Sequence, residues 1–78
     1  MMYFLYSYRF GSATKDGVCA IKDGVVDPDK ALMVSAAKAS GESIRDMTYW
    51  AVTSRDHLIS KVGEQELARI EAIAEGVD

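Results

Sequence analysis

The alternation of side chains is clearest in the first ten residues, where it predicts a β-strand. Four aromatic residues recur at every second position: Phe4, Tyr6, Tyr8 and Phe10. Because successive side chains of a strand point to opposite faces, this spacing places all four on one face. Aromatic side chains suit the pleated surface of a sheet, so this face is expected to pack against helices.

The following residues predict a second, shorter strand. Glycine and polar residues over 11–17 indicate a loop, and Asp16-Gly17 is a typical turn dipeptide. Val18 to Lys22 then forms a strand that ends at Asp23-Gly24. The two strands are expected to pair antiparallel as a hairpin with a long loop.

A helix is predicted after this hairpin. Asp27 can accept hydrogen bonds from the first free N–H groups, and Pro28 suits the first helical position because it lacks an N–H. Gly41 is a plausible helix end. The apolar stripe is rich in alanine and includes Leu32, Met33, Ala36, Ala37 and Ala39.

Met47 to Thr53 predicts another strand, and both of its faces are apolar. One face carries Thr48, Trp50 and Val52, and the other carries Met47, Tyr49 and Ala51. This pattern is typical of a central strand or of a strand with one face buried by a partner.

Residues 54–63 leave two alternatives open. Ser54 can cap a short helix with Leu58, Ile59 and Val62 on one side, closed by Gly63. Alternatively, residues 57–62 form a fourth strand. A faint internal repeat favours the strand, because Thr14-Lys15-Asp16-Gly17 before Val18 is similar to Ser54-Arg55-Asp56-His57 before Leu58.

The last segment, Glu64 to Glu75, predicts a helix that ends at Gly76. Together these elements predict one α+β domain over residues 1–78. We expect a small antiparallel sheet of three or four strands with two helices on one face, in the order ββα-β(β)-α.

The other sheet face would then be exposed. It would carry four large apolar side chains, namely Tyr3, Leu5, Met47 and Tyr49. A patch of this kind usually marks an interface, and a domain of this size has a thin core. The pattern therefore predicts a homodimer formed through this face or its edge strand.

Charge argues against nucleic acid as the partner. The net charge is −3, and the basic residues are spread evenly instead of forming the stripe that phosphate binding requires. The segment from Glu64 to Asp78 has a local charge of −4, which suits a basic protein surface. Glu71 and Glu75 are the candidate contacts, and a solvated helix face is the simpler alternative.

The sequence contains no recognisable catalytic, metal or nucleotide motif. Cys19 and His57 are the only residues of their kinds, and Cys19 falls within a strand where a small buried residue fits. Turn and cap chemistry explains the aspartates at 23, 27 and 29 without a calcium loop. We therefore expect no enzyme activity, cofactor or metal.

The composition also predicts a cytoplasmic protein. The single cysteine excludes an intrachain disulfide and fits a reducing compartment. No apolar run approaches the roughly 20 residues of a membrane span. The start, Met1 to Leu5, lacks the basic region and the cleavage site of a signal peptide.

Two other functions have some support. The aromatic strand could stack bases of single-stranded nucleic acid, although the basic surround is missing. A dimer could hold a small anionic ligand between subunits with Arg9, Arg45 and Tyr8.

The order of features resembles that of small uncharacterised phage and prophage proteins. These features are Tyr6-Ser7-Tyr8-Arg9-Phe10, a glycine-bearing hairpin, one helix, and a strand with Tyr49-Trp50, all within residues 3–53. The resemblance implies a compact accessory protein without enzymatic machinery that binds a host protein. A non-enzymatic protein-interaction module is thus the expected function.

Overall fold

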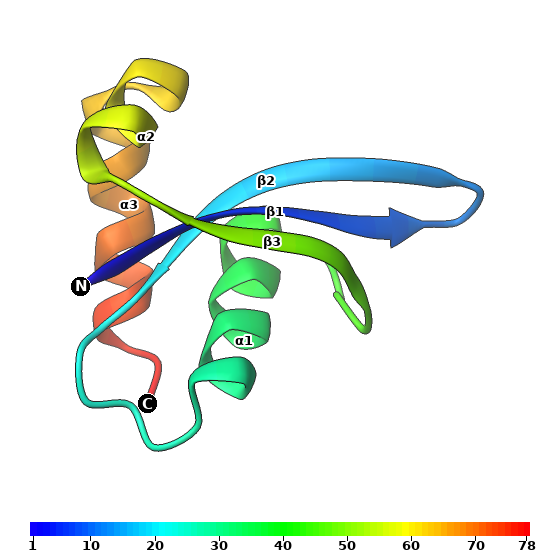
Figure 1. The fold of residues 1–78 in the computed structure, drawn as a ribbon, viewed down its shortest axis with the longest axis horizontal. Coiled ribbons are helices and arrows are strands. Elements are labelled where there is room, and N and C mark those ends of the chain that lie inside the picture. Colours follow the sequence, from blue (N-terminus) through cyan, green and yellow to red (C-terminus); the bar gives the residue numbers. More distant parts are fainter.

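Three strands and three helices make up the protein in a computed structural model that describes residues 1–78 (Figure 1). The elements are β1 (Met2–Phe10), β2 (Ala13–Ile21), α1 (Pro28–Ser40), β3 (Met47–Thr53), α2 (Arg55–Val62) and α3 (Glu64–Glu75). The strands form one antiparallel sheet in the order β2-β1-β3. The predicted α+β class is confirmed, and β3 has the predicted bounds.

The hairpin is tighter than predicted. Phe10 pairs with Ala13, so only Gly11 and Ser12 form the turn. Gly11 has a φ of 63°, as the first central position of a two-residue type II′ turn requires. The prediction of a long loop ending at Asp16-Gly17 was wrong, because these two residues lie within β2.

Gly17 has a packing role inside β2. It pairs directly with Tyr6 of β1. A Cβ atom at residue 17 would lie 2.4 Å from Cζ and Oη of Tyr6, so the ring lies directly against the glycine backbone. Because Gly17 has no side chain, the ring of Tyr6 can pass over β2 toward α1. There the Tyr6 hydroxyl donates to the carbonyl of Ala36 at 3.4 Å.

α1 covers the aromatic face of β1. Phe4, Tyr6 and Tyr8 are each 3% exposed and pack in one core with Leu32 and Ala36 of α1. The predicted burial of these three rings is confirmed. Phe10 is 49% exposed because it lies near the tip of the hairpin, where the ammonium of Lys15 sits 3.8 Å from its ring centre.

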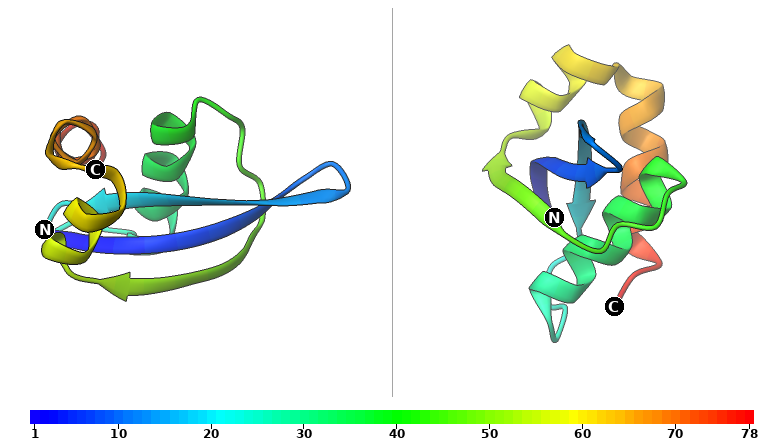
Figure 2. Two further views of the ribbon diagram at one scale, coloured as in Figure 1. Left: turned by 90° about the horizontal axis from the view of Figure 1, so that it is seen from above. Right: turned by 90° about the vertical axis from the view of Figure 1, so that its right-hand side faces the viewer.

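The last helix packs differently from α1. Ile70 and Ala74 of α3 form a second cluster with Ala20, and Tyr3 packs against it. Ala20 pairs with Tyr3, so this cluster is on the sheet face opposite Phe4. The two helices therefore do not share one face as predicted: α1 covers one face, while α3 runs along the edge formed by β2 (Figure 2).

The residues after α3 return to the first core. Val77 is 5% exposed and belongs to the core cluster that contains the aromatic side chains of β1 and Leu32 of α1. Lys22, at the end of β2, forms an ion pair with Asp78. Val77 is thus held by the main core, and Asp78 is held by an ion pair at the end of β2.

Residues 55–62 form a helix, so the favoured prediction of a fourth strand was wrong. The Oγ of Ser54 accepts a hydrogen bond from the backbone N–H of His57 at 3.1 Å, which caps the helix. Leu58 is fully buried. Gly63, with a φ of 85°, then turns the chain into α3. The spacing of Leu58, Ile59 and Val62 indicated the helix correctly, whereas the faint sequence repeat did not.

The start of β3 contains an irregularity that changes which face its residues occupy. Ser7 pairs with Tyr49, but Tyr8 pairs with Met47, so the register shifts by one residue. Met47 consequently packs against the core on the α1 side. The prediction that Met47 shares a face with Tyr49 was wrong, because a bulge reverses the alternation.

The contact between Tyr6 and residue 17 can be tested by substitution. We expect Gly17→Ala to destabilise the protein by about 1–3 kcal/mol, since the new methyl group overlaps a buried ring. Urea unfolding measures this change. Gly76→Ala is the matched control because its added Cβ would meet only an ordinary contact at 3.6 Å. An equal loss in both variants would contradict the proposed role of Gly17.

Candidate protein-interaction surface

The outer edge of β3 is the most exposed apolar part of the sheet. Tyr49, Trp50 and Val52 are 58%, 47% and 60% exposed. β3 pairs with β1 on one side only, and both views in Figure 2 show no element beside its other edge. We call Tyr49–Thr53 of this strand the β3 edge.

This exposure follows from the position of α1. The helix packs over β2 and the aromatic side of β1, and it leaves the same face uncovered over β3. Trp50 and Val52 lie on this uncovered part, because they pair with Tyr6 and Phe4. The ring of Trp50 meets the ring of Phe4 edge to face, at 5.6 Å between centres and 68° between planes.

The β3 edge lacks the usual protection of an edge strand. Exposed edges normally carry charged residues or proline, which prevent pairing with other chains. Met47–Thr53 contains neither. The opposite edge, β2, carries Lys15 and Asp16 in its exposed half and is flanked by α1 and α3 in its buried half. β3 is thus the strand at which the sheet can be extended.

The structure separates the four side chains predicted to share an open face. Tyr49 lies on the β3 edge, and Met47 lies on the other face. Leu5 is half-buried and lines a groove beside Tyr49. Tyr3 is half-buried under α3. The exposure of Trp50 and Val52 was not predicted from the sequence. The signal for it was the alanine-rich helix, because a helix with small side chains is too slender to cover a face of three strands.

Tyr3 belongs to a polar network that joins β1, α2 and α3. Its hydroxyl donates to Oε2 of Glu71 at 2.6 Å. Arg55 donates to the same carboxylate through Nε at 3.1 Å and Nη2 at 3.3 Å. The hydrogen bonds from Arg55, and then from Tyr3, hold the pKa of Glu71 below its ordinary value. Glu71 is therefore engaged within the chain, whereas Glu75 is exposed.

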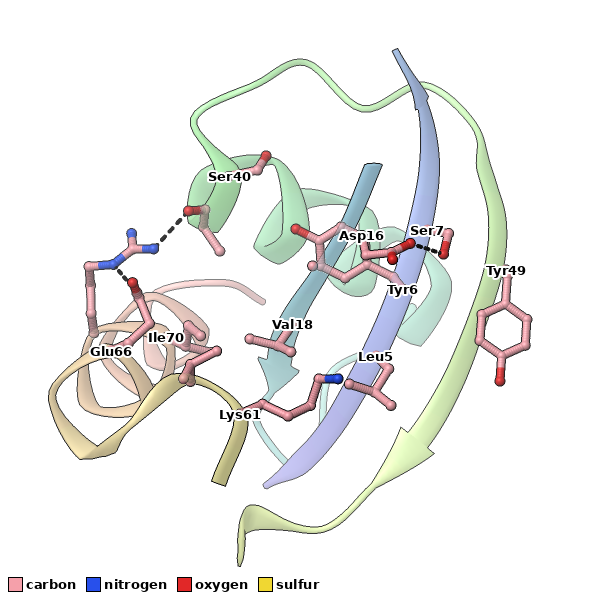
Figure 3. Close-up of a pocket in the computed structure, with 14 residues that line it drawn as sticks. Leu5, Tyr6, Ser7, Asp16, Val18, Ser40, Tyr49, Lys61, Glu66 and Ile70 are labelled. Carbon is pink, nitrogen blue, oxygen red and sulfur yellow. Dashed lines mark hydrogen bonds and ion pairs between the residues drawn. The ribbon is translucent and has the colours of Figure 1, made fainter. Parts of the chain in front are cut away.

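A groove of about 480 Å³ lies between the open sheet face and the helices α2 and α3 (Figure 3). Its apolar lining includes Leu5, Val18 and Ile70. Lys61 extends from the end of α2 toward Leu5 and forms no ion pair. The other charged groups are partnered: Asp16 accepts from the hydroxyl of Ser7, and Arg69 pairs with Glu66. The groove thus combines an apolar floor with one free cation.

The structure places Cys19 and His57 in different surroundings and gives Tyr8 a partner within the chain. Cys19 is fully buried, and burial raises the pKa of its thiol to about 12. His57 is exposed on the first turn of α2. The hydroxyl of Tyr8 donates to Oε2 of Glu42 at 3.1 Å, so a carboxylate occupies the place suggested for an anion.

No group of three or more metal-ligating side chains gathers anywhere in the structure. Asp27 instead caps α1, where its Oδ1 accepts from the N–H of Lys30 at 3.2 Å.

No protein-family model, curated protein or solved structure matches the chain. The three helices are also too short and too polar for any of them to cross a membrane.

The network around Glu71 predicts a pH dependence of stability. The folded-state pKa of the Glu71 carboxylate lies below its ordinary value of 4.5. Its contribution to the free energy of unfolding is therefore fully present above pH 4.5 and is lost as the pH falls through the lowered pKa. We expect the unfolding free energy of Glu71→Gln to fall less steeply below that value than that of the natural protein.

Urea unfolding measured over a series of acidic pH values tests this expectation. Glu75→Gln is the matched control, because Glu75 is exposed and its carboxylate has no partner in the chain. Parallel pH profiles for Glu71→Gln and the natural protein would contradict the role of the network.

Proposed function

We propose that the protein is a non-enzymatic protein-interaction module whose contact surface is the β3 edge. In this proposal, a partner adds an extended segment to the sheet beside β3. Backbone hydrogen bonds supply the affinity of such strand addition, and the alternating side chains supply the specificity. The observation that carries the proposal is an uncharged edge strand whose large side chains are exposed on both faces.

The composition of the β3 edge agrees with this function. Tyrosine and tryptophan are the residues most enriched at the energetic centres of protein interfaces. Tyr49 and Trp50 lie next to each other on opposite faces, so an added strand would contact one ring on each side. The acidic balance of the chain supports a protein partner over nucleic acid.

The aromatic side chains give less support to base stacking than the sequence suggested. Phe4, Tyr6 and Tyr8 pack beneath α1, and Phe10 holds the ammonium of Lys15 over its ring. The resemblance to small phage and prophage proteins adds to the proposal a cytoplasmic accessory role, in which the bound protein belongs to the host.

A lysine on the β3 edge should prevent binding. We expect Val52→Lys to weaken partner capture from a nuclease-treated bacterial lysate by about tenfold or more, because an added strand would bury the charge without a counterion. Quantitative mass spectrometry of the captured proteins measures the effect.

Val26→Lys is the matched control, since it makes the same change at a residue that is 97% exposed in the loop before α1. The proposal requires a protein that the natural chain and Val26→Lys capture and Val52→Lys does not. Equal capture of the same lysate protein by all three chains would reject the β3 edge as the surface that binds it.

The groove favours ligand binding as a second candidate function. Its volume of about 480 Å³ is within the ~300–1,000 Å³ range of small-molecule sites. An apolar floor below the free ammonium of Lys61 suits a small carboxylate with an apolar body.

This candidate predicts that decanoate raises the melting temperature of the natural protein. The shift should disappear in Lys61→Met, which keeps an unbranched apolar stem and removes the charge. Lys38→Met, at an exposed site on α1, serves as the control. A melting temperature that decanoate leaves unchanged would remove the candidate.

A further inference from the structure

The regular part of β3 has a centre about which the strand can pair with itself. Pairing with β1 is regular from Tyr3 with Thr53 to Ser7 with Tyr49, and the bulge follows immediately. The middle residue of this regular segment, Tyr49–Thr53, is Ala51. An antiparallel pair of identical strands is related by a two-fold axis, and an axis through Ala51 pairs every residue of this segment with a residue of the same segment in the other copy.

We propose that a second copy of this chain adds to the β3 edge, with Ala51 opposite the partner subunit's Ala51, so that two sheets join into one of six strands. The inference rests on the proposed function, since it uses the same edge and names the partner. Of the two contacts predicted for a homodimer, the open sheet face or its edge strand, it takes the edge strand, where backbone groups make the contact.

The side chains complement each other in this register. Trp50 faces the partner subunit's Val52 on the α1 side, and the two-fold axis repeats this pair. Tyr49 faces the partner subunit's Thr53 on the other side, and this pair also occurs twice. Cross-strand pairs of an aromatic with a β-branched residue are among the favourable ones in sheets. Every exposed large side chain of the β3 edge thus obtains a counterpart.

Charge and closure also favour a second copy as the occupant. The paired segment carries no charged residue, so the two copies do not place like charges opposite each other within it. Pairing uses the free edge of both copies. The remaining edges are the two β2 strands, which α1 and α3 flank in their buried halves and which carry Lys15 and Asp16 in their exposed halves. The assembly therefore stops at two chains and does not continue as a fibre.

The register can be tested by disulfide formation across the axis. Ala51→Cys places two cysteines directly opposite each other, at a Cβ separation of about 4.5–5.5 Å that small shifts convert into a disulfide. We expect mild oxidation to link the purified chains into a covalent dimer. The natural Cys19 does not interfere, since it is fully buried.

Thr53→Cys is the matched control, because its two copies would lie four residues apart along the paired strands, roughly 13 Å. Sedimentation velocity of the natural protein, Val52→Lys and Val26→Lys completes the experiment. The inference expects dimers for the natural protein and Val26→Lys. Val52→Lys should raise the dimer dissociation constant at least about tenfold, because its charge is buried beside Trp50 of the other copy.

Two results would overturn the inference. One is a natural protein that stays monomeric at millimolar concentration. The other is a dimer that Ala51→Cys does not link faster than Thr53→Cys. Neither result alone decides the proposed function. If the protein is monomeric but captures a lysate protein through the β3 edge, the proposed function stands and only the dimer is rejected. If it is monomeric and captures nothing, both proposals are rejected.

Discussion

The structure depends on burying one aromatic face of β1. Phe4, Tyr6 and Tyr8 supply most of the bulk of the main core, because α1 contributes mainly alanines and Leu32. Small side chains on the helix allow it to lie close to these rings, and the missing side chain of Gly17 lets the ring of Tyr6 reach it. In a domain of this size, little other apolar area is available to stabilise the fold.

This arrangement also explains why one side of the sheet remains exposed. A single slender helix cannot cover three strands. α1 lies over β2, where the ring of Tyr6 passes above Gly17 and its hydroxyl donates to the carbonyl of Ala36. α3 also packs against β2, but from the opposite face, where Ile70 and Ala74 contact Ala20. Both large helices therefore protect the β2 edge. The interaction surface that we propose is a direct result of this unequal coverage.

Local signals in the sequence predicted most of the elements. Asp27, Pro28 and Gly41 marked the ends of α1, and the alternation of β1 identified its buried rings. The errors came from features that depend on distant residues. The role of Gly17 became visible only through its pairing with Tyr6, and the face of Met47 depended on a bulge between β1 and β3.

Only part of the candidate site could be predicted, again because the rest depends on distant residues. Tyr49 was identified because its strand is apolar on both faces. Trp50 and Val52 were not, since their exposure depends on where α1 packs across the sheet. Glu71 depends on distant residues too: its charge suggested contact with a partner, and the structure adds that Arg55 and Tyr3 bind it within the chain. Neither outcome can be inferred from spacing along a single segment.

The burial of Val77 has a consequence for synthesis in the cell. This residue belongs to the same core as Phe4 and Tyr6, so the first strand and a residue beyond α3 share one cluster. Because a chain is made from its N-terminus, the aromatic face of β1 emerges from the ribosome long before the residue that helps to cover it. α1 can pack on these rings earlier, but the core cluster stays incomplete until residue 77 has left the exit tunnel.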